Sequence, residues 1–384
     1  MHTSNRSRRA RRPARALVAL AVLLAAAACT DDPDVATGGD DDRAVDCAPT
    51  DDVDRIDLGD AAVDADAGVT VKLGTHDSFA VGDGVLESFT AETGIEVEVV
   101  ALGDAGEAVS QAILTAGEPV VDVLYGVDTT FVCRAIAADV FVPYRAAGLD
   151  RVPDALLAPG EDRVTPIDVG DVCLNYSKAA FPDPSDAPQD LDDLLAERFA
   201  DAFVTEDPAS SSPGLAFLLA TIATYGDGWE AYWEGLRENG VAVASGWSEA
   251  YEDDFGAGAG ERTIVTSYAS SPVADVLFSD PPRDEPAIGV VADACFRQVE
   301  YAGVLRGTGH PTAAARLVDF LLSPTFQADI PLNMFVEPAR EDVALPPEFE
   351  AHRTPIDDPI TLDPAEIEAG RDRWTERWTE IVLR

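Results

Sequence analysis

Hydrophobic and polar positions after residue 66 follow two alternating periods. Strand-like runs rich in β-branched residues occupy 69–75, 95–102 and 120–125. Apolar residues at helical spacing follow these runs in turn, at 85–93, 108–116 and 129–138. A period of two predicts strands, and a period near 3.6 predicts helices. This regular alternation predicts an α/β fold, with a parallel sheet covered by helices.

The middle of the chain departs from that alternation. Two further predicted strands, 169–176 (VGDVCLNY) and 293–305 (DACFRQVEYAGVL), bracket a block at about 177–290 that has its own helices and strands. A chain that leaves one α/β domain, builds a second and returns predicts two lobes, joined by two crossover strands around a ligand cleft that closes by a hinge. We therefore assign three segments: 67–170 to lobe 1, 171–290 to lobe 2, and 291–384 to the return to lobe 1 with C-terminal helices.

Acidic residues stand where the predicted strands of the first lobe end. Ligands of parallel sheets bind at the carboxyl ends of strands, where loops collect. Asp77, Asp104 and Asp128 all follow such ends, so position alone makes them candidate site residues.

The first 28 residues have the pattern of an export signal. Six Arg lie within the first 15 residues, and an uncharged apolar stretch, Ala16 to Ala28, follows. This stretch is shorter than the ~20 residues that span a bilayer. It runs into Cys29 and resembles a bacterial lipobox, whose cysteine is lipidated, although Ala26 stands where a bulky aliphatic residue is usual. The alternative is an ordinary signal peptide cut after Ala28. Residues 29–66 begin with a polar, acidic run, which predicts a flexible tether to the outer face of the cell membrane.

Composition excludes several partners and cofactors. The 384-residue chain has a net charge of −44, which becomes more negative when the Arg-rich leader is removed. Such a surface repels nucleic acid and anionic headgroups. Four His and no CxxC pair offer no zinc-type site, and we expect no metal and no cofactor. Apart from Cys29 four cysteines are present, and an even number in an oxidising compartment favours two disulfides.

Three segments place aromatic and hydroxyl groups at predicted strand or helix ends. Trp247, in GWSEAY, follows the strand-like run VAVAS, and SYASSP leads from a strand into a turn that begins a helix. DPASSSPGL is rich in hydroxyl groups and precedes another helix. Hydroxyls and free N–H groups at a helix N-terminus suit an anion or a carbonyl. Trp and Tyr faces suit an aromatic or cationic ring.

Taken in order, these segments resemble the thiamine-binding proteins of bacterial ABC importers, which are extracellular solute-binding proteins. The resemblance covers most of the mature chain and rests on THDSFAVGDG, VALGD, DVLYGVD, EDPASSSPGL, GWSEAY, SYASSP, SPTFQADIP and RWTERW. It implies the type II fold of periplasmic binding proteins and a protein without enzymatic activity that delivers thiamine, or a thiamine phosphate, to a membrane permease. We expect a monomer.

The matched motifs imply eleven ligand-binding positions that face the cleft: Asp77, Asp104, Ala105, Ser211, Ser212, Trp247, Tyr268, Ala269, Ser270, Ser271 and Phe335. The resemblance makes Trp247 the stacking aromatic and places Ser211 and Ser212 near the phosphate end. A Trp face is worth about 0.5–2 kcal/mol to the cationic thiazolium ring, and carboxylates can accept from the amino group. Without the resemblance, Trp247 would be ordinary core and the two serines a helix cap.

The sequence departs from the family's pattern at three positions. His76 stands where the family has Tyr, Ala274 where some members have a second stacking aromatic, and Phe335 where a Trp lines the cleft. We expect either that the ligand ring is held less tightly than in the family, or that Tyr251 or Phe79 supplies the second aromatic face.

The positions of the cysteines predict their pairing. Cys173 and Cys295 lie in the two crossover strands, which run side by side at the hinge. We expect these two to pair and, by elimination, Cys47 to pair with Cys133.

Other classes of protein stay open. A ferric iron or polyamine binder has the same fold, but iron sites of that group have adjacent Tyr ligands, and only Tyr268 stands in the right segment. A secreted hydrolase acting on a thiamine-like substrate needs a nucleophile, and the sequence has neither a GxSxG elbow nor a cysteine placed beside a base. A structural adhesin has no need of a two-lobed cleft.

Overall fold

The computed structural model describes residues 47–49, 53–59, 61–62, 64–160 and 162–384. The expected signal peptide, the candidate lipidation site Cys29 and much of the expected tether lie outside these residues. No helix in the described ranges combines the length and the apolar character needed to cross a bilayer.

Nine strands of the described residues form one mixed sheet, in the order β2-β1-β3-β8-β4-β7-β5-β6, with β9 paired to β4. Their bounds are β1 Thr70–Thr75, β2 Glu96–Ala101, β3 Val123–Asp128, β4 Thr165–Ser177, β5 Phe203–Glu206, β6 Ala242–Ala244, β7 Ile264–Tyr268, β8 Ile288–Val304 and β9 Glu337–Pro338. β1 pairs in parallel with β2 and β3, and β5 pairs in parallel with β6 and β7. The long strands β4 and β8 are antiparallel to each other and join these two parallel groups.

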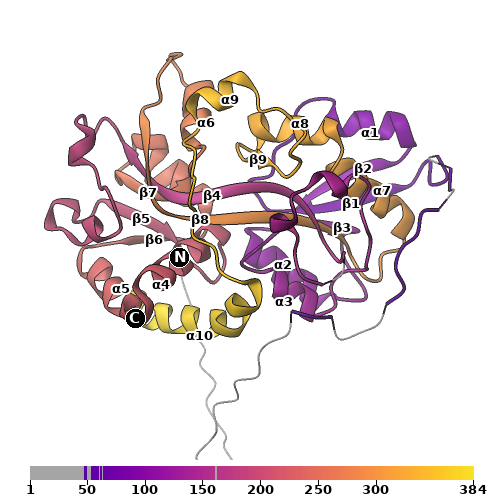
Figure 1. Cartoon of the computed structure of the whole chain (residues 1–384), viewed down its shortest axis with the longest axis horizontal. Coiled ribbons are helices and arrows are strands. Elements are labelled where there is room, and N and C mark those ends of the chain that lie inside the picture. The colour runs from indigo at the N-terminus through magenta and orange to yellow at the C-terminus, as the bar shows by residue number, and fades with distance from the viewer. Residues whose placement is uncertain (1–46, 50–52, 60, 63, 161) are drawn as a thin grey trace, which may run out of the picture. The chain divides into compact units, whose positions relative to one another are not determined.

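Helices cover both faces of this sheet. Their bounds are α1 Val85–Thr93, α2 Ala105–Leu114, α3 Val132–Ala137, α4 Ser212–Tyr225, α5 Trp229–Glu238, α6 Ser271–Leu277, α7 Pro311–Leu321, α8 Pro324–Asn333, α9 Pro347–His352 and α10 Pro364–Val382. Figure 1 shows β4 and β8 side by side through the middle of the sheet, with α6, α8 and α9 above it and α2, α3 and α10 below it.

Local interactions explain where the predicted elements begin. α1 has the bounds expected from its apolar spacing. α2 begins three residues earlier than expected because the side chain of Asp104 accepts from the N–H of Ala105 and caps the helix. α3 begins later, because the Asp128 carboxylate accepts from the N–H and hydroxyl of Thr130 and holds a turn ahead of the helix.

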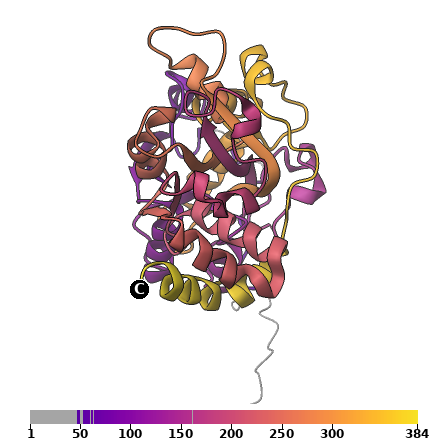
Figure 2. The ribbon, with the colours of Figure 1, turned by 90° about the vertical axis from the view of Figure 1, so that its left-hand side faces the viewer.

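The C-terminal helix α10 packs on the second parallel group. Trp378 is fully buried, and its ring meets Trp233 of α5 edge to face with centroids 5.5 Å apart. Arg377 donates to Glu230 of the same helix α5 at 2.8 Å. Figure 2 shows the yellow α10 against these helices at the base of the ribbon. The aromatic residues of α10 therefore serve packing.

Two disulfides join distant parts of the chain. Cys173 on β4 pairs with Cys295 on β8, and Cys47 pairs with Cys133 on α3, which is the connectivity that the sequence led us to expect. Near Cys47 the N–H of Ile56 donates to the carbonyl of Pro143, and the Ile56 side chain packs on a buried apolar cluster. The described part of the segment expected as a tether is therefore attached to the body at these points.

The carboxyl ends of both parallel groups reach the middle of β4 and β8. Asp128, the last residue of β3, lies opposite Glu300 of β8. Tyr268, the last residue of β7, lies opposite Val172 of β4. Loops that leave the two groups therefore meet over the centre of the long strands, where ligands of such sheets bind.

Candidate functional site

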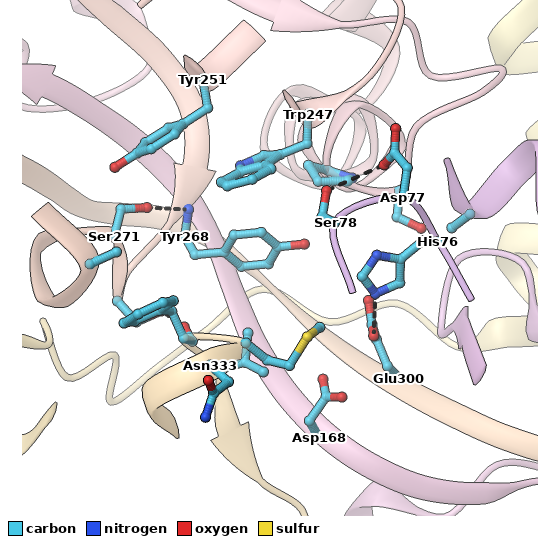
Figure 3. A pocket seen from close by; sticks show the side chains of 18 of the residues that line it. His76, Asp77, Ser78, Asp168, Trp247, Tyr251, Tyr268, Ser271, Glu300 and Asn333 are labelled. Carbon is cyan, nitrogen blue, oxygen red and sulfur yellow. Dashed lines mark hydrogen bonds and ion pairs between the residues drawn. The ribbon is translucent and has the colours of Figure 1, made fainter. Parts of the chain in front are cut away.

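A cavity of about 270 Å³ lies where these loops meet. Its walls come from the loops after β1, β2 and β6, from the N-termini of α2, α4 and α6, and from the turn after α8; the side chains are shown in Figure 3. Nine of the eleven expected ligand-binding residues line it: Asp77, Asp104, Ala105, Ser212, Trp247, Tyr268, Ser270, Ser271 and Phe335.

The other two expected residues, Ser211 and Ala269, are not part of the lining. Ser211 precedes the first residue of α4 and is fully buried, with a hydroxyl that has no hydrogen-bond partner. Ala269 packs in a small buried cluster with the Cys173–Cys295 disulfide. Each lies next to a lining residue in the sequence, but its side chain lies outside the cavity.

Aromatic rings form one wall of the cavity. The indole of Trp247 stacks on Tyr251 with centroids 4.9 Å apart and planes 13° apart, and its Nε1 donates to the Ser267 hydroxyl at 3.0 Å. The ring of Tyr268 is tilted to the indole at 6.4 Å (Figure 3). Because Tyr251 is in direct contact with Trp247, no ring fits between the two.

Neither expected source of a second stacking face lies across the cavity from Trp247. Tyr251 covers the indole directly, and Phe79 packs edge-on against Tyr125 outside the lining. Phe278, which the sequence did not single out, lines the cavity although the residue is 73% exposed, and its ring meets Phe335 edge to face at 5.4 Å.

Asp104 connects two walls of the cavity. One carboxylate oxygen accepts from the N–H of Ala105 at 2.7 Å, and the other accepts from the N–H of Trp247 at 3.2 Å. Nearby, the hydroxyls of Ser78 and Ser248 are 3.2 Å apart. Burial raises the pKa of Asp104, and these two backbone hydrogen bonds lower it in part. Asp104 therefore positions the loop that carries the indole.

Asp168 and Glu300, from the two long strands, form the floor of the cavity (Figure 3). The Tyr125 hydroxyl donates to Asp168, and the His76 Nε2 lies 3.5 Å from the Glu300 carboxylate. The His76 ring packs over Gly126, where an added Cβ would lie 2.5 Å from its Cδ2. Burial lowers the pKa of His76, but the carboxylate of Glu300, together with those of Asp104 and Asp168, more than offsets this, and the pKa rises to about 9.

Sequence reasoning missed both floor acids. Glu300 is a charged residue inside a strand-like run, and Asp168 stands at the edge of another. A lone carboxylate in a buried strand costs free energy unless it has a role or a partner. A charged residue within or beside a strand-like run can be recognised in the sequence, but the sequence does not show which groups its carboxylate faces.

Acidic side chains outnumber basic ones in the lining, where His76 is the one basic side chain among the described residues. Five carboxylates contribute to it: Asp77, Asp104, Asp168, Glu252 and Glu300. None of the described residues that line the cavity is Lys or Arg. An aromatic wall over an acidic floor suits a flat, positively charged ligand.

Two groups of parallel strands joined by long strands around such a cavity define a solute-binding protein. Residues 118–356 match the family described as bacterial extracellular solute-binding protein, and the chain belongs to this family. A thiamine-binding periplasmic protein of Escherichia coli (strain K12) is 30% identical over 317 residues, which cover 81% of this chain and 92% of the relative. One of Brucella suis biovar 1 (strain 1330) is 29% identical over 328 residues, which cover 83% and 94%.

Solved structures agree with this assignment. A periplasmic thiamin binding protein is similar with a TM-score of 0.73 and 28% identity, over 82% of this chain and 96% of that one. Iron-bound HitA from Pseudomonas aeruginosa has a TM-score of 0.67 over 82% and 99%, but at 22% identity the likeness shows the fold alone. The periplasmic-binding fold expected from the sequence is confirmed.

Proposed function

We propose that this chain is the substrate-binding component of an ABC importer and that its ligand is thiamine. The observation that carries the proposal is the cavity, which the Trp247 indole lines together with five carboxyl groups, while His76 is the one basic side chain among the described lining residues. Thiamine has a thiazolium ring with a fixed positive charge and an aminopyrimidine with a donor edge. The indole face attracts the cation, and the carboxylates accept from the amino group. The names of the relatives in Escherichia coli and Brucella support this choice.

The N-terminus of α4 offers a binding position for the phosphate of a phosphorylated thiamine. Ser212 and Pro213 bring the N-terminus of the 14-residue α4 to the cavity. Helix N-termini attract anions through their free N–H groups and dipole. We assign the hydroxyethyl end of thiamine, or its phosphate, to this side of the cavity.

The alternatives from the sequence fit the cavity less well. An iron binder needs clustered ligands, and no group of three or more His, Cys, Asp or Glu in the described residues is arranged to hold a metal ion. A polyamine is cationic but has no flat ring to use the indole. We assign no covalent chemistry to the protein, which binds its ligand and releases it.

Export and anchoring complete the proposal. The leader and Cys29 fit a lipoprotein held at the outer face of the cell membrane. We propose that the halves of the chain on either side of β4 and β8 close on the ligand by bending at these strands. The closed monomer then docks on its permease.

Titration calorimetry of the exported domain tests the ligand. We expect saturable binding of thiamine at one site and no binding of ferric citrate or spermidine. Heat from spermidine or ferric citrate without heat from thiamine would replace thiamine with that ligand.

A further inference from the structure

Three carboxyl groups lie in a row across the middle of the sheet. Asp128 on β3 and Asp168 on β4 each lie directly opposite Glu300 on β8, which stands between them. Side chains of directly opposite residues lie on one face, with Cβ atoms about 4.5–5.5 Å apart. The three residues are 0%, 1% and 8% exposed, for Asp128, Asp168 and Glu300 respectively. Two of them line the floor of the cavity (Figure 3).

The groups that face this row carry too little positive charge to neutralise three ionised carboxylates. His76, from the end of β1, lies 3.5 Å from Glu300, which is longer than a normal hydrogen bond. The other titratable neighbours, namely Tyr125 on β3, Tyr268 on β7, Tyr301 on β8 and Asp104 at the start of α2, supply no positive charge. One imidazolium therefore faces three carboxyl groups.

Not every carboxyl oxygen of the row has a hydrogen-bond partner. The hydroxyl of Tyr125 donates to Asp168, and Thr130 donates to Asp128. The Oε2 atom of Glu300 is buried, lies 3.5 Å from the Nε2 of His76 and accepts no hydrogen bond, and the Oδ2 atom of Asp128 is also buried without a hydrogen-bond partner. Three buried carboxylates cannot all be ionised at this spacing without further positive charge, because each loses hydration and repels the others. In the empty site the row must therefore hold protons.

The pKa values follow the same geometry. Burial, with the neighbouring Glu300 carboxylate, raises the pKa of Asp168 well above its usual range. Burial raises the pKa of Asp128 to about 7. At neutral pH the empty row is thus partly protonated, and a nearby cation lowers all of these pKa values.

We propose that the row Asp128–Glu300–Asp168 is a cation subsite in which the positive charge of the ligand replaces a proton, so that binding releases a proton to solvent. The proposal rests on the proposed function and concerns the floor of the same cavity. The O–H bond of a carboxylic acid breaks, the proton passes to the buffer, and the carboxylate faces the ligand cation. Thiamine brings a permanent charge and no proton of its own, so the release is not cancelled. A proton lost from His76 beside the same cation adds to it.

The affinity of the subsite for a cationic ligand should depend on pH. A ligand that displaces protons binds more tightly as the free row loses them, so affinity rises with pH. For each proton released, the gain is up to about tenfold per pH unit below the pKa of about 7 at Asp128. A neutral ligand of the same shape shows no such rise.

Calorimetry of the wild-type protein in two buffers at one pH tests the proposal. Tris and phosphate differ greatly in ionisation enthalpy, so a released proton makes the observed binding enthalpy differ between them. We expect a difference that corresponds to about one proton per thiamine. Deazathiamine, a neutral analogue in which carbon replaces the charged ring nitrogen, should show none. Thiamine binding with equal enthalpy in both buffers overturns the subsite and leaves the proposed function standing. Absence of thiamine binding in both buffers overturns the proposed function.

Two variants separate the row from the charge of the protein as a whole. Glu300→Gln keeps the shape of the side chain and removes one carboxyl from the row. We expect it to weaken thiamine at least about tenfold, to reduce the proton release, and to leave deazathiamine within about threefold. Glu118→Gln removes an exposed carboxyl before β3, at the end of that strand away from the cavity, and should change none of these. Equal losses for both ligands in Glu300→Gln would overturn the cation subsite.

Discussion

Replacing Trp247 with alanine tests the aromatic wall of the cavity. The indole is held by stacking on Tyr251 at 4.9 Å and by its hydrogen bond to Ser267 at 3.0 Å, so its face is fixed before the ligand arrives. A cation–π contact at a desolvated Trp is worth up to about 2 kcal/mol, and about 1.4 kcal/mol is a factor of ten in Kd. We therefore expect Trp247→Ala to weaken thiamine binding about 30-fold in calorimetry.

Two companion variants show whether the ring face is responsible. Trp247→Phe keeps a smaller aromatic face and loses the Nε1 donor, so we expect a loss of about fivefold. Phe278→Ala removes the ring of a residue that is already 73% exposed, and it should weaken thiamine binding less than about threefold. A folded Trp247→Ala protein that binds thiamine within about twofold of wild type would refute the stacking role.

Three further outcomes can be measured. In Asp104→Asn the amide oxygen replaces only one of the two acceptors used by Ala105 and Trp247. Thiamine affinity should therefore fall about tenfold, while the free energy of unfolding falls by only about 1 kcal/mol. Unchanged affinity by calorimetry would contradict this. Thiamine monophosphate should bind at least about fivefold more weakly than thiamine, because the acidic lining repels phosphate more than the α4 N-terminus attracts it; equal affinity in a competition titration would contradict this. Replacing both Cys173 and Cys295 with serine opens a bridge between residues 122 positions apart and should lower the free energy of unfolding by about 4–5 kcal/mol; an unchanged denaturation midpoint would contradict this.

Much of the fold could be predicted because the sequence patterns that specify its helices and strands are local. The bounds of α1 match the apolar spacing, and Gly84 and Gly94 flank the helix with positive φ angles of 84° and 73°. The strand-like runs of β4 and β8 also marked the two joining strands correctly. Where prediction missed, the cause was a side-chain interaction such as the Asp104 cap, which moved the start of α2.

The site could be predicted only in part. Motifs gave the segments that reach the cavity, but they could not separate Ser212, which lines it, from Ser211, which is buried beside it. Neighbours at a helix start point in different directions, and only the packing decides which one faces the ligand. Asp168 and Glu300 meet through a strand register that shifts at irregularities on either side. Such long-range register is not readable from one sequence.

The central claim is that an acidic, aromatic cavity binds a cationic ring. Titration of the wild-type exported domain with thiamine and with neutral deazathiamine tests it most directly. Thiamine should bind saturably at one site and at least about tenfold more tightly than deazathiamine, because only thiamine carries the charge that the indole and the carboxylates attract. Equal or tighter binding of the neutral analogue, or no binding of thiamine, would contradict the account.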